Sequence, residues 1–363
     1  MKIKKPLILG VVAGLALSTF AAITPAFADP VSNSYVLVGS DTLQDSANAL
    51  TNGSSVTGSS VRVVANGSSL GNFDAFGSAN IQTKPGGPFF YRPAGSGDGR
   101  NALISSITGA AWHGTVITGQ VDIARSSSGP GSNANSAGDL AYVPYGRDAV
   151  AYAYYGPAAD LGNLTTAQLK AIYESNTDVT IGGTVVKPLI PQSSSGTRSF
   201  FLGAIGVTTL GSTVSSSYNG VTNTLPENNA TVLTEVGQIV PFSAASWVAQ
   251  ANGAAPSSLT ANAAMGSPDG VAPFTTSGTT LVPSSTFYAT AFGRDTYVIV
   301  EFARIDPTDA KYDVNLADLV DRTKPTSLTN FSASPTSSGA VKKKFGFLAP
   351  ASTTVIRAYP SVY

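Results

Sequence analysis

Short apolar stretches alternate with short amphipathic stretches along the chain, a pattern that predicts strands and helices in turn. Residues 149–155 alternate small and large apolar side chains and predict a buried strand. Apolar residues spaced three and four apart predict helices after a cap at Ser40, over 165–174, around 201–205 and over 243–251. This alternation indicates an α/β fold with largely parallel sheets.

Two polar segments interrupt the pattern. Residues 51–72 are rich in Ser, Gly and Asn, and predict a surface hairpin or loop that carries one short strand at 61–64. Lys342, Lys343 and Lys344 form a charge run, which predicts a solvated face of the protein.

The same tripeptide opens two β-rich runs. Gly146-Arg147-Asp148 precedes the first run and Gly293-Arg294-Asp295 precedes the second. A chain of 363 residues exceeds the size at which single cores stop growing, so two lobes are expected. If the chain crosses between lobes at the first run and returns at the second, residues 29–148 and 293–363 form one lobe and residues 149–292 the other.

The amino end has the features of an export signal. Lysines stand at positions 2, 4 and 5, an apolar run covers 7–22, and Ala26-Phe27-Ala28 supplies the small residues that a signal peptidase requires. We therefore expect residues 1–28 to be cleaved. Because the sequence has no Cys, a lipid anchor at a cysteine is excluded, and a secreted or periplasmic product is expected.

The composition excludes several kinds of chemistry. With no Cys there are no disulfides, thiolate nucleophiles or Cys-bound zinc sites, and His113 is the only His, so neither a multi-His metal site nor a metal cofactor is expected. Charged residues make up only 12% of the chain and the formal net charge is zero, which argues against nucleic-acid binding through a basic face. No other cofactor is indicated.

Four loops share a composition that suits an anion. Each is rich in Gly and Ser, and each stands where a strand is expected to give way to a helix. Gly lets the backbone expose its N–H groups, hydroxyls add donors, and a helix N-terminus adds partial positive charge. Such loops can surround phosphate or sulfate with few formal charges. The four loops cover residues 39–42, 95–100, 125–129 and 193–198.

Motifs within these loops resemble a known family. In the order of the chain, they are Gly95-Ser96-Gly97-Asp98-Gly99, then Val121 through Ser127, then Ser195-Gly196-Thr197-Arg198 followed by two Phe. This series resembles the phosphate-binding proteins of bacterial ABC importers, which are periplasmic-binding-protein-like. The resemblance implies an α/β, two-lobed fold with two crossing hinge strands and one oxyanion between the lobes.

The resemblance also implies ligand residues and a partner. Ser127 stands where many members of the family have an Asp that accepts the proton of hydrogen phosphate, and Pro191 stands where they have an Arg. A second branch of the family has Ser and a following Arg at these places, which makes Arg198 the cationic ligand. An ABC permease is the implied partner, and a monomer is expected. The implied ligand set is Thr42, Leu43, Ser96, Ser127, Ser195, Gly196, Thr197 and Arg198.

Selectivity between phosphate and sulfate is a separate question. The two dianions differ by a proton that a carboxylate can accept. Asp41 and Asp98 stand inside donor loops, and we hypothesise that one of them makes this discrimination; helix capping is their alternative role.

Two other functions stay open. A secreted hydrolase would use a loop Ser with His113 as its base. A cell-surface or scavenging protein would keep the binding fold without a permease. The favoured interpretation is a binding protein with no catalytic residues.

Overall fold

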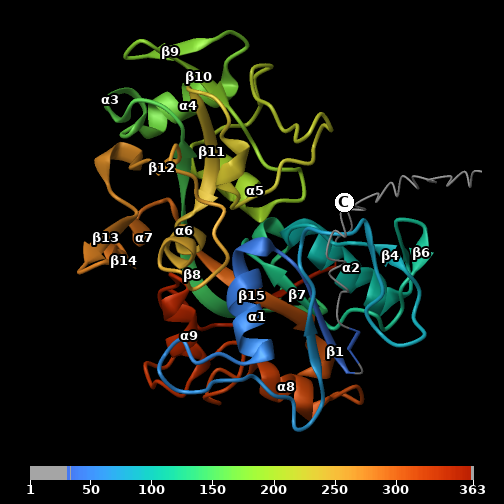
Figure 1. Cartoon of the computed structure of the whole chain (residues 1–363). Helices are drawn as coiled ribbons and strands as arrows, with labels where there is room; N and C mark the ends of the chain where they lie inside the picture. Colours follow the sequence, from blue (N-terminus) through green and yellow to red (C-terminus); the bar gives the residue numbers. More distant parts are fainter. Residues whose placement is uncertain (1–30, 33, 361–363) are drawn as a thin grey trace, which may run out of the picture.

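The computed structural model describes residues 31–32 and 34–360, which form two lobes stacked one above the other (Figure 1). The predicted signal peptide, residues 1–28, lies outside the described residues. Within the described residues, one ten-stranded sheet runs through both lobes. The strands follow the order β2 (Leu70–Asn72), β1 (Tyr35–Gly39), β7 (Ile123–Ser126), β15 (Gly293–Glu301), β8 (Leu140–Tyr154), β11 (Gln238–Ser243), β10 (Thr184–Pro188) and β9 (Val179–Ile181), and β12 (Ala264–Met265) and β16 (Ile356–Ala358) also pair with β8.

Helices and small hairpins cover this sheet. The helices are α1 (Gln44–Asn52), α2 (Ser96–Thr108), α3 (Ala158–Leu161), α4 (Thr166–Glu174), α5 (Gly196–Ala204), α6 (Ala244–Ala251), α7 (Ser285–Tyr288), α8 (Val314–Val320) and α9 (Ser338–Lys344). Short 3-10 turns are η1 (Asp41–Leu43), η2 (Gly131–Asn133), η3 (Ala230–Val232), η4 (Pro268–Gly270) and η5 (Phe302–Arg304). The two-stranded pairs are β3 (Asn80–Ile81) with β4 (Phe90–Tyr91), β5 (Ala111–Trp112) with β6 (Thr115–Val116), and β13 (Phe274–Ser277) with β14 (Thr280–Pro283).

None of the helices in residues 31–32 and 34–360 has both the length and the apolar character needed to cross a bilayer.

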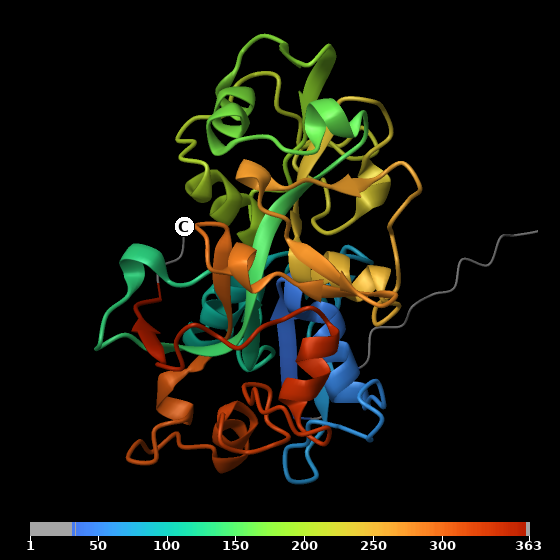
Figure 2. The ribbon, with the colours of Figure 1, turned by 90° about the vertical axis from the view of Figure 1, so that its left-hand side faces the viewer.

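Strand β8 belongs to both lobes. Residues 140–149 pair with β15, and residues 150–154 pair with β11. Figure 2 shows β8 as one long strand that rises from the lower lobe into the upper lobe. We call the lobe that contains β1 and β7 lobe 1, and the lobe that contains β9, β10 and β11 lobe 2. The expected α/β, two-lobed fold with two crossing strands is therefore confirmed, whereas the residue boundaries of the lobes remain a prediction.

The expectation of largely parallel sheets is wrong. Strand β8 is antiparallel to all four of its partners, β11, β12, β15 and β16. The reason is topological: the chain passes toward lobe 2 along β8 and returns along β15, so the two neighbouring strands must run in opposite directions. Among the strands of the described residues, parallel pairing occurs only between β1 and β2, β1 and β7, and β10 and β11.

The predicted helices are present. Thr165 and Gln168 form a reciprocal capping box at the start of α4, and Ser243 caps α6 through the N–H of Ser246. Helix α5 ends just before Gly206, which has a φ of +71°. These signals are local in the sequence, which is why the pattern locates the helices.

Two local predictions are wrong. The chain after Ser40 is helical, but it starts with η1, and the Ser40 side chain makes no capping hydrogen bond. Residues 61–64 do not form a strand, because Val61 makes only an isolated bridge with Ser54. Val61 and Val63 instead bury their side chains in the core of lobe 1.

The predicted solvated lysine run is wrong at its first residue. Lys342 is fully buried, and its Nζ donates hydrogen bonds to the carbonyl oxygens of Tyr145 at 2.6 Å and Leu328 at 2.8 Å. The ammonium also lies 4.2 Å from the centre of the Tyr145 ring. Burial lowers the pKa of Lys342 well below its usual range. A charge run read as one surface can thus contain a residue that points inward.

Candidate functional site

The first predicted loop lies at the end of β1. Gly39 has a φ of +109° and its Cα touches the second loop, because a Cβ on Gly99 would lie only 2.6 Å away. This close backbone approach holds the two loops together. Thr42 is buried with its hydroxyl toward lobe 2, whereas the Leu43 side chain packs into the core of lobe 1, so only the main chain of Leu43 is available to a ligand.

Hydroxyls of the second and third loops meet at the start of α2. The Ser96 Oγ accepts a hydrogen bond from the Ser127 N–H at 2.9 Å, and the two Oγ atoms are 3.1 Å apart. Both residues are buried. A Cβ on Gly196 would lie 2.3 Å from the Ser96 Oγ and 2.4 Å from the Ser127 Oγ, so a glycine is needed for lobe 2 to come this close.

The last loop begins α5 in lobe 2 and is in contact with lobe 1. The Ser195 Oγ caps the helix by accepting from the Arg198 N–H at 2.9 Å. The Thr197 Oγ1 lies 3.4 Å from the Thr42 Oγ1. Between the lobes, the Gly97 N–H donates to the Ser194 carbonyl at 3.0 Å. The N-termini of α2 and α5 thus approach each other, each offering partial positive charge.

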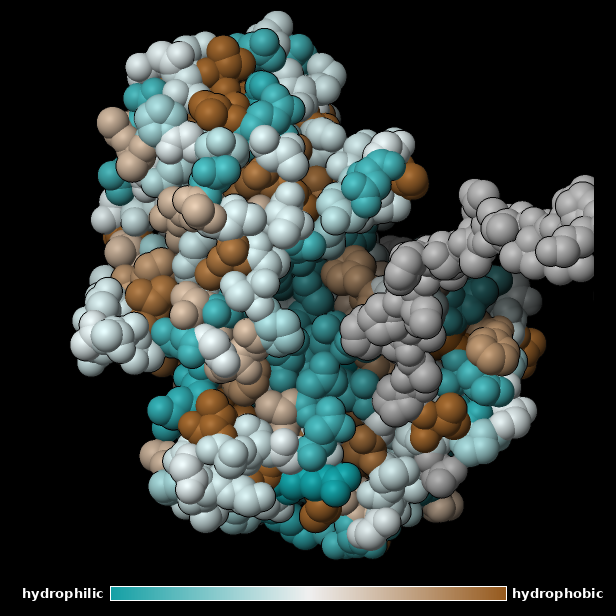
Figure 3. Space-filling view, viewed as in Figure 1, coloured by the Kyte–Doolittle hydropathy of each residue, from teal (hydrophilic) through white to brown (hydrophobic). Residues whose placement is uncertain are grey.

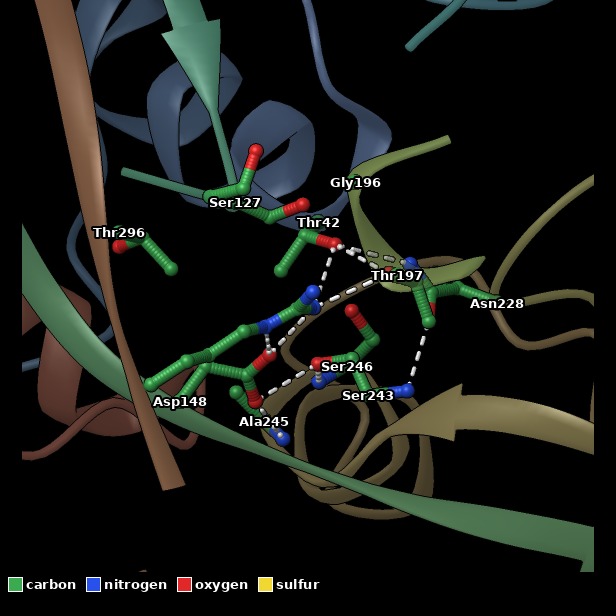
Figure 4. Close-up of polar contacts among 12 residues, drawn as sticks. Thr42, Ser127, Asp148, Gly196, Thr197, Asn228, Ser243, Ala245, Ser246 and Thr296 are labelled. Atoms are coloured by element: carbon green, nitrogen blue, oxygen red, sulfur yellow. Dashed lines mark hydrogen bonds and ion pairs between the residues drawn. The ribbon is translucent and has the colours of Figure 1, made fainter. Parts of the chain in front are cut away.

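The residue at the centre of these groups is one that the sequence analysis did not assign. Arg294, on β15, is 3% exposed, and its Nη2 donates to the Thr197 Oγ1 at 3.0 Å and to the Thr42 Oγ1 at 3.3 Å. Its Nη1 is buried without a hydrogen-bond partner. Figure 4 shows the polar contacts that meet at Thr42 and Thr197, with Asp148 and Ser243 in the same group. Arg294 therefore joins lobe 1, lobe 2 and the hinge.

Asp148 fixes the orientation of this arginine. Its Oδ2 accepts from the Arg294 Nε at 3.1 Å and from Nη2 at 2.8 Å. Its Oδ1 accepts from the Ser243 Oγ at 2.8 Å and from the Ala245 N–H at 3.0 Å, at the start of α6. The carboxylate is fully buried and every one of these contacts is a hydrogen bond, so the guanidinium is held in one position.

The repeated tripeptide is the signal that could have identified Arg294. In the antiparallel register of β8 and β15, Arg294 stands opposite Asp148, and Asp295 stands opposite Arg147. The arginine of each tripeptide therefore pairs with the aspartate of the other. The ion pair between Arg294 and Asp148 is buried, and the one between the Arg147 Nη1 and the Asp295 Oδ1, at 3.0 Å, is partly exposed. The sequence shows both tripeptides, but neither which residues pair nor which pair is buried.

The remaining predicted residues lie at the edge of this group. The Arg198 Nη1 donates to the Pro191 carbonyl at 2.9 Å, and partial burial lowers the pKa of Arg198. Asp98 accepts from the Ala94 N–H at 3.2 Å, and burial raises its pKa. Asp41 directly precedes Thr42, and one amide nitrogen holds both side chains. The Asn228 Nδ2 donates to the Asp41 Oδ1 at 3.1 Å and to the Thr42 Oγ1 at 3.3 Å. Of the two candidate selectivity residues, Asp41 is thus the one adjoining the threonines.

Two other chemical candidates have different surroundings. Arg125 is fully buried and donates to the carbonyl oxygens of Gly39, Ser40 and Phe73, so it joins strand ends. His113 is exposed, and its ring stacks on Tyr91 with the centroids 4.2 Å apart. Residues 31–32 and 34–360 contain no group of three or more His, Cys, Asp or Glu that could hold a metal ion.

A cavity adjoins the meeting point of the helices. It has a volume of about 200 Å³, and its lining includes Ser96, Ser195, Ser199, Gly196 and Arg100. Hydroxyl groups from both lobes therefore face the same space. Its lining has hydroxyl groups and Arg100 but no carboxylate, which is the chemistry that suits an anion, and Arg294, Thr42 and Thr197 lie outside this lining.

Comparison with known proteins agrees with the fold. An ABC-type phosphate transport receptor from Vibrio cholerae is 16% identical with a TM-score of 0.51, over 87% of this chain and 100% of that chain. A Clostridium perfringens protein, described as a phosphate ABC transporter substrate-binding protein with bound phosphate, is 12% identical with a TM-score of 0.50, over 87% and 99%. No curated protein sequence gave a match. The family model described as the PBP superfamily domain matches residues 50–325, so this chain belongs to the PBP superfamily.

Proposed function

We propose that this chain is an exported solute-binding protein that captures inorganic phosphate, or an oxyanion of the same shape, between its lobes. One observation carries the proposal. The buried Arg294 guanidinium has a free Nη1 beside the hydroxyls of Thr42 and Thr197, which come from opposite lobes. A tetrahedral oxyanion has enough acceptor oxygens to take hydrogen bonds from all of these donors at once.

The charge balance fits such a ligand. Arg294 is paired with Asp148, so the binding of an anion is favoured mainly by aligned dipoles and hydroxyls. The N-termini of α2 and α5 supply the dipoles, and Ser96 and Ser127 supply further hydroxyls. The two similar solved structures support the choice of phosphate, since their descriptions name phosphate transport and bound phosphate.

The proposed mechanism is capture by closure, without covalent chemistry. A ligand favours the closed lobes only if it contacts both of them better when they are closed. Thr42 and Ser96 belong to lobe 1, and Gly196 and Thr197 belong to lobe 2, which meets this condition. The hydrolase alternative has less support, because the Ser194 Oγ donates to the Ala94 carbonyl and the His113 ring stacks on Tyr91.

The complete proposed ligand set adds Arg294 to the residues implied by the sequence. Lobe boundaries at 148/149 and 292/293 are part of the proposal, and Ala149 pairs with Gly293 where these boundaries meet. Cleavage of the signal peptide, monomeric behaviour and delivery to an ABC permease rest on the sequence and on the family resemblance. The full set is Thr42, Leu43, Ser96, Ser127, Ser195, Gly196, Thr197, Arg198 and Arg294.

Ligand titration tests the proposal. Protein freed of ligand by denaturation and refolding would be melted with phosphate, arsenate, sulfate or methylphosphonate. A ligand that binds only the native state stabilises it by about 2.7 kcal/mol at one hundred times its Kd. We expect phosphate and arsenate to raise the melting temperature and sulfate to raise it less. If none of the four anions changes the melting temperature at millimolar concentration, the proposed function is wrong.

A further inference from the structure

Two carboxyl groups from opposite lobes face each other beside the proposed anion site. Asp41 lies in η1 of lobe 1. Glu227 lies in the segment before η3 of lobe 2, where the neighbouring Leu225 packs with Trp247. Glu227 directly precedes Asn228, whose side chain reaches Asp41 across the lobe boundary, and Glu227 is the charged group that acts most strongly on Asp41. Asn228 strengthens this contact between the lobes by donating to the Asp41 Oδ1 at 3.1 Å.

Glu227 lacks any donor of its own. It is 2% exposed, and neither of its carboxyl oxygens receives a hydrogen bond from an N–H or O–H group of the described residues. A hydrogen bond between two carboxyl groups requires that one of them carry a proton. Two buried carboxyl groups held side by side in this way are stable together only when they share a proton.

The surrounding charges do not replace this proton. The charged groups that face Asp41, besides Glu227, are Asp45 on α1, Arg294 on β15 and Arg125 on β7. Arg294 is already paired with Asp148, and Arg125 donates to backbone carbonyl oxygens. Asp45 adds a further negative charge to the same region, so closure brings together carboxylates without a free cation between them.

We propose that closure of the lobes takes up a proton at the Asp41–Glu227 pair, so that acidic solution favours the closed, ligand-holding state. The ligand in this statement rests on the proposed function, whereas the proton uptake rests on the two carboxyl groups alone. The receptor would then hold its anion more firmly in acidic surroundings and release it more readily as the pH rises.

The direction follows from the two states. In the closed lobes, burial and the facing Glu227 raise the pKa of Asp41 well above its ordinary value of 3.8. When the lobes part, water reaches both carboxyl groups and the pKa of Asp41 returns toward that value. The closed state therefore binds more protons, and its advantage is lost as the pH rises through the closed-state pKa.

Solvent has a route to the Asp41 side of this pair. Asp41 lines a cavity of about 550 Å³ between the lobes, together with Asp45, Asp74 and Asn228. Figure 3 shows hydrophilic side chains gathered along α1 in the middle of this face. A proton can exchange through this polar region without passing the anion site.

Calorimetry of phosphate binding measures the proton directly. Titration at pH 5.5 in two buffers with different ionisation enthalpies gives the number of protons taken up per phosphate bound. The key variant is Glu227→Gln, whose amide donates to Asp41 without needing a proton. The matched control is Glu174→Gln, which alters a surface ion pair with Lys170 in the same lobe.

We expect the parent and Glu174→Gln to take up about one proton more than Glu227→Gln. The difference between variants removes the protonation of phosphate itself, which all three share. Between pH 5 and 7, the Kd of the parent should rise relative to that of Glu227→Gln by up to about tenfold per pH unit. Equal proton uptake by the parent and Glu227→Gln would overturn the proposal.

A measurement without ligand separates this inference from the proposed function. Small-angle scattering of the ligand-free protein gives a radius of gyration that grows when the lobes open. We expect that radius to increase from pH 5 to pH 8 in the parent and in Glu174→Gln, and to stay constant in Glu227→Gln. If phosphate does not bind, the proposed function fails and this result alone decides the inference: a radius that does not depend on pH in the parent overturns it.

Discussion

Replacement of Arg294 by Lys tests the centre of the proposed site. Lys keeps the positive charge next to Asp148, but a single ammonium cannot bind that carboxylate through two nitrogens and still present a free donor to a ligand. The change removes the Nη1 donor and the contacts of Nη2 with Thr42 and Thr197. A hydrogen bond to a charged group contributes about 1.5–3 kcal/mol, so we expect phosphate binding to weaken about ten- to hundredfold.

Isothermal titration calorimetry with phosphate measures the effect, and the second tripeptide supplies a control. Arg147→Lys makes the same substitution on the neighbouring strand, in an ion pair with Asp295 that is partly exposed. We expect its affinity to stay within about twofold of the parent. Arg198→Lys shows whether the arginine implied by the family resemblance contributes. The reasoning is refuted if Arg294→Lys, with an unchanged melting temperature, binds phosphate as tightly as Arg147→Lys does.

Two further substitutions have specific expected results. Gly196→Ala places a Cβ 2.3 Å from the Ser96 Oγ and 2.4 Å from the Ser127 Oγ. Phosphate affinity should therefore fall at least tenfold, with little change in the stability of the ligand-free protein. The control is Gly203→Ala in the same helix, which should bind phosphate normally because a Cβ there meets nothing within 4 Å. Lys342→Met leaves two backbone carbonyls without their donor and should lower the free energy of unfolding by about 1–3 kcal/mol in urea titrations. Because burial lowers the pKa of Lys342, the parent loses stability as the pH falls, whereas Lys342→Met does not lose this contribution. The difference between their free energies of unfolding should therefore shrink from pH 9 to pH 6. A difference that stays constant over this range would contradict the explanation.

Local signals in the sequence predicted local structure well. The helix over 166–174 follows a Thr cap and an apolar stripe, and the helix over 244–251 follows a Ser cap, so a few neighbouring residues determine each. Ser40 carries the same type of signal, yet its hydroxyl caps nothing. Its backbone is engaged by Arg125, which accepts from the Ser40 N–H through its carbonyl and donates to the Ser40 carbonyl through its Nε. A contact between distant residues replaced the local one.

Strand register was the information that the sequence lacked. The loops at 39–42, 95–100 and 193–198 were identified by composition, and the structure brings their hydroxyls together. Arg294 was overlooked because the tripeptide occurs twice, and only the pairing of β8 with β15 determines which arginine faces the two threonines. Lys342 was misassigned for a related reason, since three adjacent lysines on a helix point in three different directions.

The place of Arg294 on the hinge separates two contributions to binding. Because β15 pairs with β8 where the lobes meet, the proposed function lets Arg294 contact an anion before the lobes close. A contact made equally in the open and closed states strengthens binding but does not drive closure. Closure must come from groups that reach the anion only together, such as Thr42 from lobe 1 and Thr197 from lobe 2.

Loss of the Arg294 guanidinium should therefore slow phosphate association and weaken binding in both the open and the closed state. Gly196→Ala should leave the association rate unchanged and speed phosphate release. Stopped-flow measurement of phosphate association and dissociation would distinguish the two, and a purely dissociative effect of Arg294→Lys would contradict this division.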